Sequence, residues 1–113
     1  MGPYDIILYK TEGGKEPYAE WINRLRDRAG IQRIATRIER VAQGHLGDHK
    51  SLGDGVFELR LHFGPGYRVY FGRAGEVIIL LLCGGDKDTQ DRDIALAKSY
   101  WADWVSSLER SGE

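Results

Sequence analysis

Two arginines occupy matching positions in two adjoining segments in which polar and apolar residues alternate. The segments form the stretch ELRLHFGPGYRVYF, residues 58–71, and its central GPG predicts a tight turn that folds one strand back on the other. Because side chains alternate between the faces of a strand, Arg60 and His62 share one face of the first strand. Arg68 and Tyr70 likewise share a face of the second. Any register that keeps the apolar residues together also keeps both arginines together.

The residue types on this face suit a phosphate group. A turn centred on the proline sets His62 opposite Arg68 and Arg60 opposite Tyr70. Arginine offers paired donors to phosphate oxygens, and Tyr70 on the same face is placed to stack on a base. The sequence therefore predicts a cationic platform for phosphate. The alternative is an ordinary exposed sheet face with an Arg–Glu ion pair that contributes about 0–1 kcal/mol.

Two polar loops border this hairpin in the sequence. His49 and Lys50 end the loop before the first strand, and Asp86 and Lys87 follow the apolar segment that comes after the second strand. We expect each pair at an end of the sheet, where it either borders the platform or faces solvent.

Other motifs with chemical meaning are absent from the sequence or incomplete. His45 and His49 are four residues apart, but Gly47 between them disfavours a helix, and no glutamate completes a zinc-peptidase motif. Neither a dinucleotide-binding fingerprint nor a phosphate-binding P-loop is complete. The single cysteine, Cys83, ends an apolar run and is expected in the core. We therefore predict no metal and no cofactor.

Length and composition limit the class of protein. The 113 residues, 42% hydrophobic and 29% charged, fit one globular domain. The longest apolar run, Val77–Cys83, is too short to cross a membrane, and the N-terminus lacks the pattern of a signal peptide. We expect a cytoplasmic protein with no membrane partner. The net charge is −1, but residues 21–73 are basic and both flanking segments are acidic, which suits a local anion-binding surface.

Hydrophobic periodicity predicts the elements that must position these residues. The expected order is βααβββα, in which the last three strands form an antiparallel meander that contains the hairpin. With one apolar sheet face available, we expect an α+β fold with the helices packed on one side of a mainly antiparallel sheet, and Trp101 and Trp104 of the last helix in the core. The predicted strands span residues 4–9, about 56–63, 67–73 and 77–83, and the predicted helices run from 17 to Gly30, from 31 to Gly44 and from 90 to 108.

Several blocks of the sequence occur together in a recognisable order. ELR, GPGYRVYF and LLCGGDK follow one another, with GKEPYAEWINRLRD before them and DTQDRDIALAKSYW after them. In this combination the chain resembles the HigB-like addiction-module killer proteins of the RelE/ParE toxin superfamily, over nearly its whole length. The resemblance implies a single toxin domain over residues 1–113. It also implies a cognate helix-turn-helix antitoxin as partner, with operator DNA bound only through the toxin–antitoxin complex.

The resemblance further implies an activity and some of its residues. RelE-like members cleave mRNA on the ribosome, so an endoribonuclease that inhibits translation is expected. Arg60 and Arg68 match phosphate-contacting arginines of RelE-like toxins, and Lys87 matches a lysine common after the last strand. Many relatives have two lysines there, whereas this chain has Asp86 before Lys87.

A cationic platform without metal ligands fits cleavage in which the RNA supplies the nucleophile. A 2′-hydroxyl attacks the adjacent phosphorus, which requires a proton acceptor, positive charge for the phosphorane and a proton for the leaving oxygen. Arg60 and Arg68 are candidates for charge stabilisation, since a guanidinium stays protonated and is no base. The candidates for proton transfer or RNA contact are Lys50, Lys87, His62, His49 and Tyr70.

Two other functions stay open on the sequence alone. ParE-like members of the superfamily inhibit DNA gyrase without catalysis, and the helical stripe Arg33, Arg37 and Arg40 either makes such a protein contact or faces solvent. The other function is a nucleic-acid-binding regulator that acts together with its antitoxin.

Overall fold

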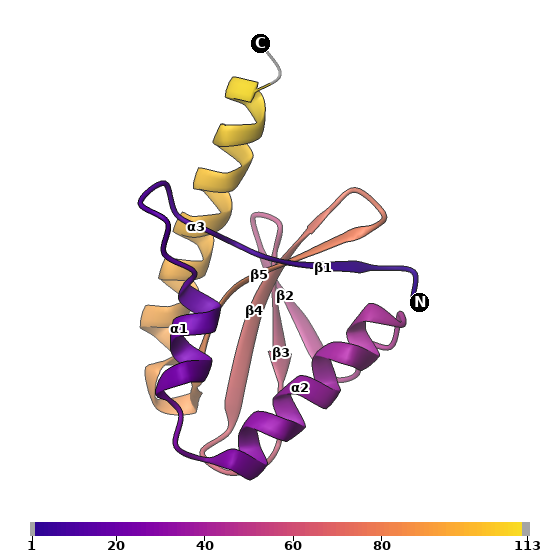
Figure 1. Cartoon of the computed structure of the whole chain (residues 1–113), viewed down its shortest axis with the longest axis vertical. Helices are drawn as coiled ribbons and strands as arrows, with labels where there is room; N and C mark the ends of the chain where they lie inside the picture. Colours follow the sequence, from indigo (N-terminus) through magenta and orange to yellow (C-terminus); the bar gives the residue numbers. More distant parts are fainter. Residues whose placement is uncertain (1, 112–113) are drawn as a thin grey trace.

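The computed structural model describes residues 2–111, which form one sheet and three helices (Figure 1). The α+β class predicted from the sequence is confirmed. The elements are β1 (Asp5–Leu8), α1 (Pro17–Arg24), α2 (Arg28–Ala42), β2 (His49–Gly53), β3 (Val56–Arg60), β4 (Tyr67–Ala74), β5 (Ile78–Asp86), a short 3-10 turn (Lys87–Thr89) and α3 (Gln90–Ser111).

The five strands form a mixed sheet in the order β1-β5-β4-β3-β2. β1 pairs in parallel with β5, and the other neighbours pair antiparallel. The predicted order βααβββα is wrong by one strand, because β2 lies in a segment that the sequence predicts to be a loop. β2 is an exposed edge strand of mostly polar residues that joins β3 through a turn at Asp54 and Gly55, both with positive φ. Such a segment lacks the apolar alternation by which strands are recognised.

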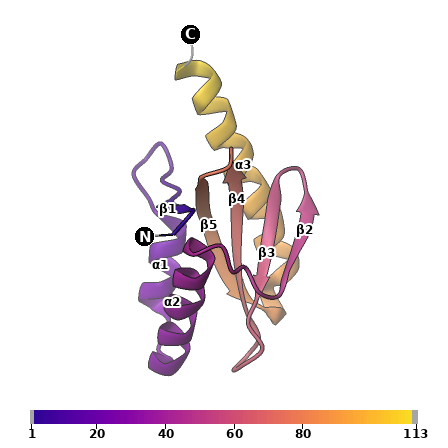
Figure 2. The same cartoon turned by 90° about the vertical axis from the view of Figure 1, so that its right-hand side faces the viewer.

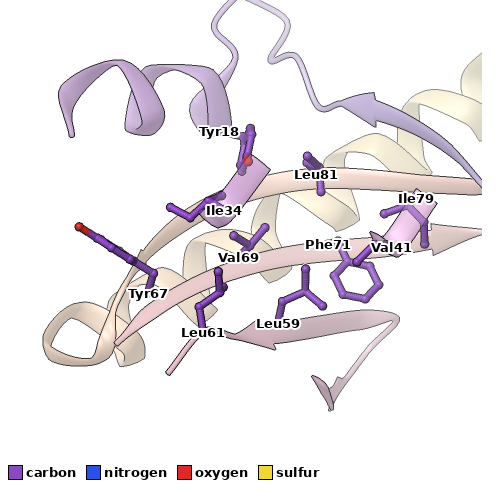
Figure 3. Close-up of a cluster of buried hydrophobic side chains, with 10 residues drawn as sticks. All are labelled: Tyr18, Ile34, Val41, Leu59, Leu61, Tyr67, Val69, Phe71, Ile79 and Leu81. Carbon is purple, nitrogen blue, oxygen red and sulfur yellow. The ribbon is translucent and has the colours of Figure 1, made fainter. Parts of the chain in front are cut away.

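The helices cover both faces of the sheet, and the prediction that they pack on one side is wrong. Figure 2 shows α1 and α2 on one face and α3 on the other. The reason lies in the central strands, since six successive residues of β4, Tyr67–Gly72, are buried and both faces therefore need cover. The first core, beneath α1 and α2 (Figure 3), consists of Tyr18, Ile34, Val41, Leu59, Leu61, Tyr67, Val69, Phe71, Ile79 and Leu81. The second core, on the α3 side, consists of Tyr9, Val56, Tyr70, Leu80, Leu82, Cys83 and Ala97.

A β-bulge in β5 supplies part of the second core. The register between β4 and β5 shifts after Tyr70, which pairs with Cys83, while Phe71 pairs with Leu81. The extra residue places Leu82 and Cys83 in the same core on the α3 side. Cys83 is buried, as predicted from the sequence, and its thiol donates to the Asp93 carbonyl at 3.7 Å.

Gly30 lies inside α2, so its predicted role as a helix end is wrong. α1 ends at Arg24, and Asp27 caps α2 by accepting a hydrogen bond from the Gly30 amide at 3.0 Å. The Tyr67 hydroxyl donates to the same carboxylate at 2.9 Å. A β-carbon on Gly30 would overlap the Asp27 carboxylate, so glycine serves here for close approach rather than for helix termination.

The tryptophans of α3 are partly buried against the second core. Trp101 and Trp104 stack on each other with ring centroids 5.3 Å apart, and Trp101 lies over Gly72 of β4, where a β-carbon would overlap its ring. Within residues 2–111, no helix is long and apolar enough to cross a membrane.

Candidate functional site

Arg60 and Arg68 lie directly opposite each other on β3 and β4. The predicted register, with His62 opposite Arg68, is therefore wrong by two residues. The Leu61 amide donates to the Tyr67 carbonyl at 3.0 Å, which centres the turn on the residue before the proline. A shift of two residues keeps every side chain on its predicted face, so both arginines share one face of the sheet. We call this the arginine face; it carries Glu58, Arg60, Arg68 and Tyr70.

Arg68 is nearly buried, with 8% of its surface exposed. Its Nη1 donates to the carbonyls of Gly66 at 3.0 Å and Tyr67 at 3.1 Å. Its Nε is buried and has no hydrogen-bond partner within residues 2–111, where no side-chain hydrogen bond uses Nη2 either. Nε and Nη2 form the guanidinium edge that binds oxyanions in pairs. The backbone thus fixes one side of Arg68, while on the other side Nε is buried and Nη2 has no side-chain hydrogen bond.

Arg60 is oriented by a buried carboxylate. Its Nε donates to Glu58 Oε1 at 2.8 Å, and Nε2 of Gln90, at the start of α3, donates to Glu58 Oε2 at 2.7 Å. Glu58 has no exposed surface, whereas a third of the Arg60 side chain is exposed. The hydrogen bond and charge of Glu58 raise the pKa of Arg60. Glu58 therefore holds Arg60 in place and offsets part of its repulsion from Arg68.

Tyr70 is fully buried, so the prediction that it stacks on an RNA base is wrong. Glu58, and not Arg60, lies opposite it. α3 packs on the arginine face at this point, and the Tyr70 hydroxyl has no hydrogen-bond partner within the described residues. Burial, and next the charge of Glu58, raise the pKa of Tyr70. The ring is a part of the second core and not of a solvent-facing platform.

Lys50 and His49 fall on opposite faces of β2. Lys50 pairs with Glu58 and therefore lies on the arginine face, at the exposed edge of the sheet. His49 pairs with Leu59, which places it on the face that α1 and α2 cover. The prediction that both residues border the platform thus fails for His49, because the strand that the sequence analysis missed alternates its side chains.

Asp86 and Lys87 stand at the other edge of the arginine face and have different positions. The Asp86 carboxylate accepts hydrogen bonds from the amides of Asp88 at 2.9 Å and Thr89 at 3.2 Å, so it caps the 3-10 turn. Lys87 is exposed; its Cβ and Nη1 of Arg68 each lie 3.4 Å from the point that a β-carbon on Gly66 would occupy. Lys87 therefore adjoins Arg68, and Asp86 has a structural role.

His62 is exposed and pairs with the carboxylate of Asp48 through Nε2. This hydrogen bond from His62 lowers the pKa of Asp48. Asp48 also anchors the chain beside Arg60, since its carbonyl accepts a hydrogen bond from the Arg60 amide at 3.0 Å. His62 thus lies two residues beyond Arg60, past the end of β3, beside Asp48 and among side chains of α2.

The site is an assembly of cations around Glu58, and a second buried carboxylate, Asp93, lies over Gly85, the strand partner of Arg68. Within residues 2–111, no three side chains of the types His, Cys, Asp and Glu are grouped so that they would hold a metal ion. The positive charge comes from the two paired arginines, with one lysine on each side, and such a surface attracts and orients a phosphodiester. The residues that converge here are Lys50, Glu58, Arg60, Arg68, Lys87 and Gln90.

Comparison with known proteins shows one relationship. An uncharacterized protein of Haemophilus influenzae is 47% identical to this chain over 81 residues, which span 72% of this chain and 82% of the Haemophilus protein. The chain belongs to the family of that protein. No protein-family model matches the sequence. The name of that relative states no activity, so the functional proposal rests on the residues of the site.

Two residues of the site, Glu58 and Gln90, were not predicted from the sequence as members of it. Glu58 appeared only as a surface partner for an arginine, and Gln90 only as the start of a helix. Glu58 lies in the alternating pattern on the same face as Arg60, which was a usable signal for its proximity. Nothing in the local sequence indicates that Gln90, 32 residues away, donates to it.

Proposed function

We propose that this protein is the toxin of a type II toxin–antitoxin module and cleaves mRNA on the ribosome. The observation that carries the proposal is the cross-strand pair of Arg60 and Arg68, with Lys50 and Lys87 on either side of it. Like charges directly opposite each other destabilise a sheet unless something opposes them. An RNA phosphate supplies the opposing charge, and the resemblance to HigB-like killer proteins supplies the biological setting.

The proposed reaction is attack of a 2′-hydroxyl on the adjacent phosphorus, which gives a cyclic phosphate and a free 5′-hydroxyl end. In this proposal Nη2 of Arg68 donates to a non-bridging oxygen of the phosphate, and the Nη groups of Arg60 donate beside it. Both interactions strengthen as charge develops on the phosphorane. The chemistry uses arginine and lysine charge and needs no metal.

Proton transfer falls to the groups beside the arginines. Lys87 adjoins Arg68, and Lys50 lies at the exposed edge on the same face. His62 is a third candidate; its Nε2 is engaged by Asp48, which leaves Nδ1.

The partners in this proposal are a cognate helix-turn-helix antitoxin and ribosome-bound mRNA in the cytoplasm. Operator DNA is contacted only through the toxin–antitoxin complex. We propose that the antitoxin acts by covering the arginine face or by displacing α3, whose first residue Gln90 is bonded to Glu58.

The experiment is 5′-end mapping of a defined mRNA incubated with the purified protein, with and without translating ribosomes. Ribosome-dependent cuts that disappear with Arg68→Ala support the proposal. Arg73→Ala is the matched control, because Arg73 is an exposed arginine farther along β4 that bonds only the Tyr4 hydroxyl. Intact message in every reaction, or equal cleavage by folded Arg68→Ala protein, rejects the nuclease assignment.

A gyrase inhibitor of the ParE kind is the second candidate, and its motive is the stripe on α2. Arg37 is committed to the fold by three hydrogen bonds to backbone carbonyls, so only Arg33 and Arg40 of the stripe are available for a partner. Supercoiling by purified gyrase at excess protein separates the two functions. A pure regulator would show salt-dependent nucleic-acid binding with the antitoxin and no cleavage.

A further inference from the structure

A basic groove separates α2 from the end of β3 and the turn between β3 and β4. Figures 1 and 2 both show the start of α2 beside this turn, at the bottom of the molecule. The groove has a volume of about 460 Å³. It is lined by Ala29, Gln32, Arg33, Thr36, Arg37, Arg40, Leu61, His62 and Phe63.

The groove carries an excess of positive charge. Three arginines and His62 line it, and the Asp48 carboxylate, which pairs with His62, offsets part of this charge. Arg33 and Arg40 are exposed, and neither takes part in an ion pair within residues 2–111. A concave surface lined by cations of one sign concentrates anions from solution.

Two of the arginines give the groove a fixed shape. Arg37 donates to the carbonyls of Leu46 at 3.1 Å, Asp48 at 2.7 Å and Arg60 at 2.8 Å, which ties α2 to the end of β3. The Arg33 guanidinium lies 4.8 Å from the centroid of the Phe63 ring. An arginine beside an aromatic ring is a pairing that also binds the bases of single-stranded nucleic acid.

The groove begins where the arginine face ends. Arg37 bonds the carbonyl of Arg60, whose side chain is on the arginine face. His62, two residues beyond Arg60 in the sequence, lines the groove itself. β2 begins at His49, opposite Leu59, so beyond Arg60 the edge of the sheet has no further strand pairing. The chain around Leu46 and Asp48 lies along this edge, because Arg37 bonds both of their carbonyls and the Asp48 carbonyl accepts from the Arg60 amide.

We propose that this groove binds the phosphodiester backbone of the RNA on one side of the cleaved phosphate. The inference rests on the proposed function for the identity of the RNA, while the groove itself is defined independently of the cleavage residues. Arg33 and Arg40 contact successive phosphates, and Arg37, between them on α2, ties the helix to the end of β3. Single-stranded RNA fits better than an acidic protein segment, because the groove pairs its cations with the Phe63 ring and its lining residue Arg37 bonds the carbonyl of Arg60.

The test compares two double variants in binding and in cleavage. Arg33→Gln with Arg40→Gln removes both available groove charges. Arg24→Gln with Arg110→Gln is the matched control, since both arginines are exposed, outside the groove and in the last turns of α1 and α3. The probe is a labelled single-stranded RNA of about 12 nucleotides with 2′-O-methyl groups, which is long enough for the groove and cannot be cut.

Counterion release sets the expected size of the effect. Each phosphate contact on a single strand contributes about 0.7 to the slope of log K against log salt. The groove variant should therefore lose about 1.4 from this slope and bind roughly 10- to 30-fold more weakly at ~0.1 M salt, with the control pair unchanged. Equal affinity and equal slopes in both variants overturn the proposal.

The same variants keep this inference separate from the proposed function. If the wild type cuts no message but the groove variant still loses RNA affinity, the groove binds RNA and the nuclease assignment fails. If cleavage occurs and RNA affinity is unchanged in the groove variant, the groove proposal fails alone. Loss of binding to an oligoglutamate with RNA affinity unchanged would assign the groove to an acidic peptide and also overturn it.

Discussion

Arg60 and Arg68 face each other across β3 and β4, and one carboxylate, Glu58, bonds only the first of them. The pair thus retains excess positive charge at a position where two strands bring guanidinium groups together. Arg68 is fixed by backbone carbonyls and Arg60 by Glu58, so neither needs the other for its orientation. This arrangement is preorganised for an anion that both arginines bind at once.

Shared binding of one phosphate predicts strongly non-additive kinetics. Arg60→Ala and Arg68→Ala should each lower the rate of ribosome-dependent cleavage by about 10²–10³, the usual effect of removing one charge-stabilising donor. The double variant should be little slower than either single variant, because residues that act as a unit do not contribute independently. The measurement is the single-turnover rate of cleavage of ribosome-bound message by the wild type, the two single variants and the double variant. Losses that multiply in the double variant would mean that the arginines bind different groups.

Glu58→Gln should lower the stability of the fold as well as disturb Arg60. The carboxylate is buried and accepts from Arg60 and Gln90, and a hydrogen bond to a charged group contributes about 1.5–3 kcal/mol. We expect the free energy of unfolding to fall by about 1–3 kcal/mol in urea titrations. Glu39→Gln, an exposed change on α2, is the control and should change little. Equal stabilities of the two variants would show that Glu58 is not held as described.

The faces of the hairpin were predictable from sequence, but what covers them was not. Alternation assigned Arg60 and Arg68 to one face correctly, and a register error of two residues did not alter this. The same face also carries Tyr70, which pairs with Cys83 and joins Leu80 and Leu82 in an apolar row. That row binds α3, and the local sequence of the hairpin contains no information about a helix that starts 20 residues later.

Short polar segments and glycines account for the other differences. β2 has no apolar alternation because only one of its edges is paired and its side chains are mostly exposed. Glycine is the residue type typical of a helix end, but at position 30 it is required because Asp27 and Tyr67 approach too closely for a β-carbon. In both cases packing and pairing in the folded chain decide the structure, and local propensity is a weak guide to them.

Asp27→Asn should remove stability only above acidic pH. The hydrogen bond from the Gly30 amide, and next that from the Tyr67 hydroxyl, lower the pKa of Asp27 below its ordinary value of 3.8. A carboxylate with a lowered pKa stabilises the fold above that ordinary value, and the contribution is lost as the pH falls through the lowered pKa. The stability difference between wild type and variant should therefore be constant from about pH 5 to pH 7 and shrink in stronger acid. Urea unfolding across this range measures it.

The control for Asp27→Asn is Glu39→Gln, whose difference from wild type should be small throughout the pH range. A difference for Asp27→Asn that is as large at about pH 2 as at pH 7 would contradict the assigned charge effect and leave only lost packing at the helix cap.

The Cys83 thiol should be unreactive in the folded protein. Burial, and next the charge of Asp93, raise the pKa of Cys83 to about 12, and the thiolate is the reactive form. At about pH 8 a thiol reagent should therefore label Cys83 of the native protein only at the rate of local unfolding around β5. In concentrated urea it should label Cys83 at once. Rapid labelling without denaturant would mean that β5 is open to solvent between α1 and α3.

Gly84→Ala should destabilise the fold by disturbing the packing of α1 on β5. A β-carbon at Gly84 would overlap the ring of Trp21, which belongs to α1 and packs against the first core. Overpacking of this kind typically costs about 1–3 kcal/mol, and thermal or urea unfolding should show a loss of that size. Gly13→Ala is the matched control, because its φ is not positive and a β-carbon there meets only the Thr11 hydroxyl, at 3.9 Å. If both variants are equally stable, α1 does not rest on Gly84, and the contact that fixes this helix beside the arginine-bearing sheet must lie elsewhere.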